Sequence, residues 1–92
     1  MLESSVESDM IRRVHKAGGM VTKLVPVKAG APDRLVILPG GKIRLVELKS
    51  ESGRLRPIQE AWHRKAAKRG VIVPVLSSTA EVKEWLAKEL RS

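Results

Sequence analysis

The sequence contains no cysteine, phenylalanine or tyrosine. The lack of cysteine excludes a disulfide scaffold, a thiolate zinc site and a cysteine nucleophile, and is compatible with a reducing cytoplasm. The two tryptophans, Trp62 and Trp85, lie on apolar helical stripes, which predicts that both are core residues. We therefore expect no aromatic platform on which nucleobases could stack.

Long apolar runs and acidic residues are also scarce. No run approaches the roughly 20 apolar residues of a membrane span, and the N-terminus lacks the basic and then apolar pattern of a signal peptide. We expect a soluble protein of the cytoplasm with no membrane partner. The 18 Lys and Arg against 10 Asp and Glu give a formal charge of +8. This balance favours a polyanionic partner, although many small basic proteins have none.

Hydrophobic spacing predicts three helices and four strands in the order αβββαβα. Helices are expected from about 5 to 17, from 57 to 69 and from 79 onward, and strands at 20–25, 34–38, 42–49 and 71–76. The third and fourth strands flank a helix, so they should be parallel within a mixed sheet. The 92 residues are expected to form a single α/β domain, 1–92.

Charged side chains gather at one end of the predicted hairpin. The two-residue period of a strand puts Glu47 and Lys49 on one face, and Asp33 stands at the start of the preceding strand. Two carboxylates beside a lysine suit a hard divalent cation held by oxygen ligands. The competing interpretations are a salt-bridged, exposed strand end for Glu47 and Lys49, and a turn residue beside proline for Asp33.

The Pro-Gly-Gly loop at 39–41 decides whether the two carboxylates meet. A two-residue loop would place Asp33 opposite Leu48, whose side chain points to the wrong face for Glu47. A three-residue loop with a left-handed glycine, or a bulge, brings Asp33 opposite Glu47 instead. We predict the second arrangement.

Glu7 lies on the inward face of the first predicted helix, three and four residues before Met10 and Ile11. An inward carboxylate requires a compensating partner. Glu7 could reach back to the Ser4 amide in a capping box, or it could reach a metal ion directly or through water. The pattern leaves both interpretations open.

These motifs together resemble the VRR-NUC domain of the PD-(D/E)XK nuclease superfamily, in its stand-alone phage or bacterial form. The resemblance is carried by Gly30-Ala31-Pro32-Asp33-Arg34, Glu47-Leu48-Lys49, Gly53, Gln59 and Trp62, with Glu7 and Lys23 where that family has Glu and Lys. It runs from about Glu3 to Leu76. Arg56 departs from it, since a small capping residue is expected before Pro57.

The resemblance implies a restriction-endonuclease-like αβββαβ core with a mixed sheet flanked by helices, plus a C-terminal helix. It further implies that Asp33, Glu47, the Leu48 carbonyl and Glu7 hold Mg²⁺ or Mn²⁺. Lys49 would position and help deprotonate the attacking water, and Gln59 would face the site.

Basic residues are the candidates for holding the polyanion. Near the proposed site these are Lys23, Lys28, Arg34, Arg54 and Arg56, and on the second helix Arg64, Lys65, Lys68 and Arg69. His15 and His63 are too few and too isolated for a histidine metal site, and we expect both to be surface or half-buried residues.

We therefore expect a metal-dependent endonuclease that hydrolyses DNA phosphodiester bonds. Its substrate would be branched DNA, similar to a Holliday junction, or otherwise structured DNA, and it would act as a homodimer in the cytoplasm of a bacterium or a phage-infected host. The alternative is a non-catalytic DNA-binding module that retains the nuclease fold.

Overall fold

The computed structural model describes residues 2–92, which form three helices and four strands in the predicted order. The elements are α1 (Glu3–Lys16), β1 (Met20–Lys23), β2 (Arg34–Leu38), β3 (Lys42–Leu48), α2 (Pro57–Lys68), β4 (Val75–Leu76) and α3 (Thr79–Arg91). The strands form one sheet in the order β1-β2-β3-β4. β1, β2 and β3 are antiparallel neighbours, whereas β3 and β4 are parallel. The predicted α/β fold and mixed sheet are confirmed.

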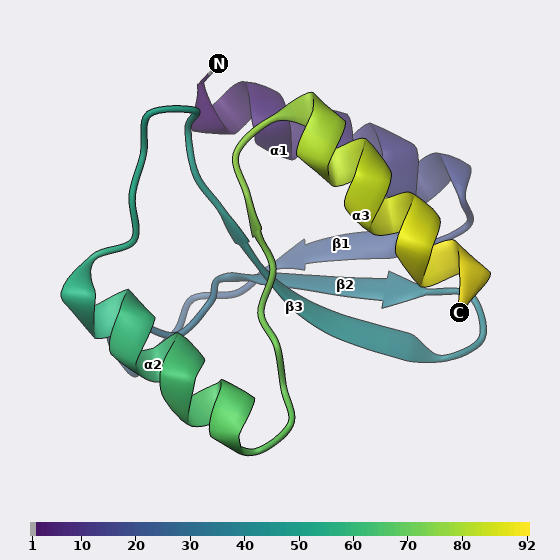
Figure 1. The fold of residues 1–92 in the computed structure, drawn as a ribbon. Helices are drawn as coiled ribbons and strands as arrows, with labels where there is room; N and C mark the ends of the chain where they lie inside the picture. Colours follow the sequence, from purple (N-terminus) through teal and green to yellow (C-terminus); the bar gives the residue numbers. More distant parts are fainter. Residues whose placement is uncertain (1) are drawn as a thin grey trace.

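The hydrophobic core lies between the sheet and the helices α1 and α3, which lie side by side in Figure 1. Every third or fourth residue of α1 is buried, namely Val6, Met10 and Val14. These side chains pack with alternate residues of the strands, including Val36 and Val46, which are fully buried. Burial of this face fixes which side of each strand points away from α1 and α3.

Helix α2 lies apart from α1 and α3, on the other side of the sheet (Figure 1). Its buried residue is the polar Gln59, whereas the preceding apolar residue, Ile58, is 47% exposed. The sheet beyond α2 is also incompletely covered, since Ile43 of β3 is 60% exposed. Thus the buried side chain of α2 is a polar one, and its apolar residues are at most half-buried. No helix in residues 2–92 is long and apolar enough to cross a membrane.

The fourth strand is shorter than predicted. Val71 and Ile72 are exposed and unpaired, and only Val75 and Leu76 pair with β3. The preceding residues form the extended link that carries the chain from the end of α2 back to the sheet. Their β-branched side chains favour an extended backbone, but this preference does not ensure a hydrogen-bonded neighbour.

The β2–β3 hairpin has the predicted register. Leu38 pairs with Lys42, which leaves a three-residue loop, and Arg34 pairs with Val46. Gly40 and Gly41 have φ values of +88° and +80°, in the region that glycine adopts without a steric penalty. One further step of this register sets Asp33 opposite Glu47, at the end of the hairpin from which the chain leaves toward α2.

Candidate active site

Glu47 is a buried carboxylate near the end of β3, with 5% of its surface exposed. Its neighbours Val46 and Leu48 point into the core between the sheet and α1, so Glu47 points to the α2 side. The backbone N–H of Glu47 donates to the carbonyl of Pro74 at 2.9 Å. Two residues further along the strand, the N–H of Lys49 donates to the carbonyl of Leu76 at 3.0 Å. These bonds to the β4 segment fix the backbone on both sides of the carboxylate.

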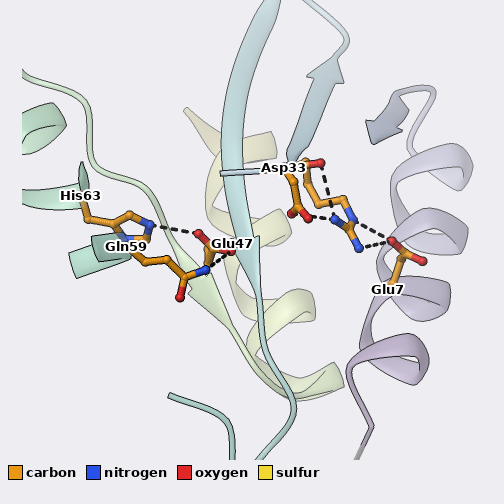
Figure 2. A network of polar contacts seen from close by, with 6 residues as sticks. Glu7, Asp33, Glu47, Gln59 and His63 are labelled. Carbon is orange, nitrogen blue, oxygen red and sulfur yellow. Dashed lines mark hydrogen bonds and ion pairs between the residues drawn. The ribbon is translucent and has the colours of Figure 1, made fainter. Parts of the chain in front are cut away.

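Two polar residues of α2 contact Glu47, and Figure 2 shows both pointing toward it. Nε2 of His63 lies 3.2 Å from Oε1 of Glu47, and Nε2 of Gln59 donates to Oε2 at 3.5 Å. Gln59 and His63 share a helix face because they are four residues apart. The side-chain oxygen of Gln59 also accepts from the backbone N–H of Arg56 at 2.9 Å. A glutamine is suited to this position because its amide can both accept at the helix start and donate to the carboxylate.

The surroundings of Glu47 raise its pKa above the usual value of 4.5, chiefly because burial penalises the charged form. The hydrogen bond and charge of His63 oppose this shift of the pKa. The negative charge of Asp33 adds to the rise, and the positive charge of Lys49 counteracts it. Asp33 and Lys49 therefore lie within electrostatic reach of Glu47.

Arg34 connects the other two predicted carboxylates. Its Nη1 lies 2.6 Å from Oδ1 of Asp33, and its Nε donates to Oε2 of Glu7 at 2.6 Å. Figure 2 shows Glu7 on α1 and Asp33 held by this shared group. Arg34 is 4% exposed, and this burial lowers the pKa of its guanidinium. The hydrogen bond and negative charge of Asp33, followed by those of Glu7, outweigh this effect and raise the pKa of Arg34 above its usual value. Glu7 and Asp33 are thereby held at one end of the sheet.

The capping interpretation of Glu7 is wrong. α1 begins at Glu3 with Leu2 in the N-cap position, so Ser4 lies inside the first turn and has no free helix start to cap. Glu7 lies one turn further on, and its carboxylate binds Arg34 instead. The inward position of Glu7 is explained by this long-range ion pair.

The predicted phosphate-binding residues lie in different settings. Lys23 is exposed at the end of β1, opposite Arg34 in the register. Arg54 and Arg56 are exposed in the segment between β3 and α2. Arg34 is buried between carboxylates, so a phosphate would reach it only by displacing one of them. Of these four residues, Lys23, Arg54 and Arg56 are therefore the ones open to solvent.

Lys49 and Leu48 complete the predicted strand end. The Leu48 side chain is 1% exposed and belongs to the core, while Lys49 is half-buried immediately after it. Among residues 2–92, no group of three His, Cys, Asp or Glu side chains is close enough to hold a metal ion together. Any ion at this end of the hairpin would need backbone, water or substrate oxygens besides the two carboxylates.

A glycine brings the loop before Asp33 against the start of α2. Gly30 is buried with φ +91°, and a Cβ atom there would lie 2.5 Å from the carbonyl oxygen of Ile58. Only glycine permits this contact without displacing the backbone of α2. At the other end of the loop, the Leu24 N–H donates to the carbonyl of Asp33 at 2.8 Å. The loop therefore sets the spacing between Asp33 and α2, the helix whose side chains contact Glu47.

The predicted half-buried position of His63 is confirmed, but its contact with Glu47 is the feature of this site that sequence reasoning missed. Its position four residues after Gln59 was the available signal. Trp62 was misplaced: it is half-buried and outside the core cluster, whereas Trp85 packs against that cluster as predicted.

Comparison with known proteins identifies the family of the chain. A sequence profile described as the VRR-NUC domain matches residues 4–80. The chain belongs to the VRR-NUC family. It is 42% identical over 77 residues, 83% of each chain, to a protein of Acyrthosiphon pisum secondary endosymbiont phage 1 described as "Putative nuclease p44". A solved structure described as "VRR_NUC domain" is 38% identical, with a TM-score of 0.83 over 92% of this chain and 94% of that one.

The matched range contains every residue predicted or found at this site, from Glu7 on α1 to His63 on α2, and extends to β4. α3 lies almost wholly outside it, although its Val82 and Leu86 close the core of this VRR-NUC domain. Membership of this nuclease family makes the chain a hydrolase by class and implies a metal ion and DNA.

Proposed function

We propose that this VRR-NUC domain is an endodeoxyribonuclease that hydrolyses DNA phosphodiester bonds with Mg²⁺ or Mn²⁺. The observation that carries the proposal is the hairpin register, which sets Asp33 opposite Glu47 with Lys49 two residues further on. The electrostatic influence of Asp33 and Lys49 on Glu47 supports their closeness. A pair of carboxylates can hold the metal ion that assists hydrolysis, and a lysine beside them can act on the attacking water.

The donor set fits a small, hard cation. Mg²⁺ is commonly held by one or two carboxylates, with water and substrate phosphate oxygens supplying its other ligands. Asp33 and Glu47 would provide those carboxylates, the Leu48 carbonyl a further oxygen, and Glu7 a contact through water. When bound, the ion would neutralise charge on the phosphate and favour ionisation of a water nucleophile.

The other residues would act on the carboxylates, water and DNA. Lys49 would position the attacking water and help to deprotonate it. Gln59 would hold the Glu47 carboxylate toward α2, since its amide is fixed by the N–H of Arg56. Lys23, Arg54 and Arg56 would bind phosphates on either side of the reacting one, with Arg34 as a buried counter-ion of Glu7 and Asp33.

We further propose that the substrate is branched, Holliday-junction-like, or otherwise structured DNA, cut by a homodimer. A domain of 92 residues offers few loops with which to grip a duplex, and two-fold pairing would widen the basic surface. Three exposed apolar side chains support association with a second copy: Met20 is 51%, Ile43 60% and Ile72 74% exposed. Light scattering at micromolar concentration tests this, and a monomer would contradict it.

The cleavage assay compares branched, flapped, linear and single-stranded DNA in Mg²⁺, Mn²⁺ or EDTA. The wild type is expected to cleave branched or flapped DNA in either metal ion and to be inactive in EDTA. Lys49→Ala should lower the rate about 10²- to 10⁴-fold, the usual effect of losing a proton-transfer group. Lys88→Ala, an equal loss of charge on α3, is the matched control and should cleave normally.

Two results would contradict the proposal: cleavage in EDTA, or normal cleavage by Lys49→Ala. The alternative of a non-catalytic DNA-binding module predicts instead that the wild type binds each DNA but cleaves none, and that Lys49→Ala behaves like Lys88→Ala. The presence of Asp33, Glu47 and Lys49 together argues against that alternative.

A further inference from the structure

A groove of about 470 Å³ opens beside the proposed active site, between α2, β3 and the link that follows α2. Its apolar lining comes from all three segments, and consists of Leu45, Trp62, Ala66 and Val71. Trp62 is half-buried and Val71 is 46% exposed, so part of this lining is open to solvent. The volume of the groove is sufficient for a flat ring.

Cationic side chains complete the lining of this groove, namely Lys28, Lys65 and Arg69. All three residues are exposed. Arg69 is anchored because its Nη1 donates to the carbonyl of Lys65 at 2.9 Å. Within residues 2–92, no carboxylate forms an ion pair with any of the three. An apolar floor with an unneutralised positive rim suits a ligand that joins a flat apolar ring to an anion.

The groove is continuous with the Glu47 site. Leu45 and Glu47 are two residues apart on the same face of β3, which separates them by about 6.6 Å along the strand. On α2, Trp62 is followed by His63, and their ring centroids are 6.4 Å apart at an interplanar angle of 76°. The groove thus begins about one extended nucleotide away from the carboxylate proposed to act on the scissile phosphate.

We propose that this groove binds an unpaired nucleotide of the DNA substrate, adjacent to the phosphate that is cut. The base lies against the indole of Trp62, and Lys65, Arg69 or Lys28 binds its phosphate. Stacking on an aromatic ring tolerates any base, since every base has a π face. A paired base inside a duplex cannot enter the groove, so DNA with an unpaired nucleotide near the cut is preferred. A second protein copy fits less well, because two basic rims would repel each other. This assignment rests on the proposed nuclease function for the position of the cut.

A fluorescence titration tests binding without requiring cleavage. Trp85→Phe leaves Trp62 as the sole tryptophan, so the emission reports on the groove. The probes, all added in EDTA, are a short oligothymidylate, an abasic strand with the same number of phosphates, and a blunt duplex. Saturable quenching by the oligothymidylate, with little by the other two, is expected. Absence of quenching, or equal quenching by the abasic strand, would overturn the proposal.

A second measurement compares affinities with labelled DNA by fluorescence anisotropy. Trp62→Ala is expected to weaken binding of flapped DNA about tenfold relative to Trp85→Phe, while blunt duplex binds both variants alike. An equal loss on both DNAs would overturn the proposal. If Trp62→Ala does not fold, Lys65→Ala with Arg69→Ala in the Trp85→Phe background must reduce oligothymidylate quenching, and undiminished quenching would overturn it.

The two proposals fail in distinguishable ways. Cleavage in Mg²⁺ without base-dependent quenching would leave the nuclease function standing and remove the nucleotide groove. Base-dependent quenching without cleavage of any DNA would support the nucleotide groove and remove the nuclease function. The groove would then be a nucleotide site on a non-catalytic domain.

Discussion

Nε2 of His63 lies 3.2 Å from Oε1 of Glu47, and this contact joins α2 to the strand that carries the proposed catalytic carboxylate. The side chain of Glu47 is 6% exposed and that of His63 is 13% exposed, so the contact is largely shielded from water. The second contact of Glu47 with α2, from Gln59, is longer at 3.5 Å. His63 is therefore the main residue that orients the carboxylate.

His63→Ala should weaken Mg²⁺ binding about 10- to 100-fold, the usual effect of removing a hydrogen-bond partner of a metal ligand. Isothermal titration calorimetry of the folded variant measures this directly. His15→Ala removes an exposed imidazole from α1 and is the matched control. Unchanged Mg²⁺ affinity in His63→Ala would show that the contact does not position Glu47.

Glu47→Gln should stabilise the metal-free protein at neutral pH, because it removes a charge whose burial is unfavourable. A raised pKa means that the folded state binds the proton more readily than the unfolded chain. The contribution of wild-type Glu47 to the free energy of unfolding is thus fully present below about pH 4.5. It is lost as the pH rises through the raised pKa. Urea denaturation in EDTA measures the free energy of unfolding of both proteins. As the pH rises from about 4.5 to neutral, this free energy should increase for Glu47→Gln relative to the wild type.

Glu81→Gln provides a control of opposite sign. Hydrogen bonds from the hydroxyl and N–H of Ser77 lower the pKa of Glu81, so its stabilising effect is present above its usual pKa and is lost on acidification. Glu81→Gln should therefore lower the free energy of unfolding at neutral pH. The difference between this variant and the wild type should vanish as the pH falls. The same sign for both variants would contradict the assignment for Glu47.

Arg34→Met should lower the free energy of unfolding by about 2 to 3 kcal/mol, because it leaves Glu7 and Asp33 without their counter-ion in a partly buried setting. If these carboxylates belong to a metal site, millimolar Mg²⁺ should restore part of the loss. Arg12→Ala breaks a pair with Asp9 in which the arginine is 64% exposed, and should cost less than about 1 kcal/mol. Similar losses for both variants in chemical denaturation would count against this account.

Gly30→Ala and Gly40→Ala form a matched pair, since both glycines have nearly the same positive φ, +91° and +88°. Each substitution should cost about 1 to 2 kcal/mol for the left-handed backbone. Only Gly30→Ala adds a clash, with the carbonyl oxygen of Ile58, whereas Gly40 has open space. Denaturation should show a distinctly larger loss for Gly30→Ala, and equal losses would mean that the loop does not press on α2.

The hairpin could be predicted from sequence to the exact register. Its loop contains a proline and two glycines, and the two-residue period of the strands makes each possible offset put a different set of side chains inward. This is why Asp33 and Glu47 could be placed opposite each other before their partners were known. The interpretation of Glu7 was settled only by a partner 27 residues away on β2.

The orientation of α2 could not be predicted from its apolar pattern, although the family resemblance implied that Gln59 would face the site. Ile58, Trp62 and Ala66 form an apolar stripe that suggested an inward face, but Gln59 and His63 one position on carry the contacts with Glu47. Adjacent stripes differ by about 100° around a helix, so tertiary contacts decide between them. The link at 71–74 was misjudged for a related reason: strand propensity reports backbone shape and not the presence of a pairing partner.

The limited burial of apolar side chains on α2 has a consequence for the motion of this helix. α1 buries Val6, Met10 and Val14, whereas α2 buries Gln59, so α2 has less apolar burial to resist local unfolding. Its amides should exchange with solvent deuterium sooner than those of α1. Each opening would also remove Gln59 and His63 from Glu47, so the proposed reactive geometry would exist only in the fraction of molecules in which α2 is docked.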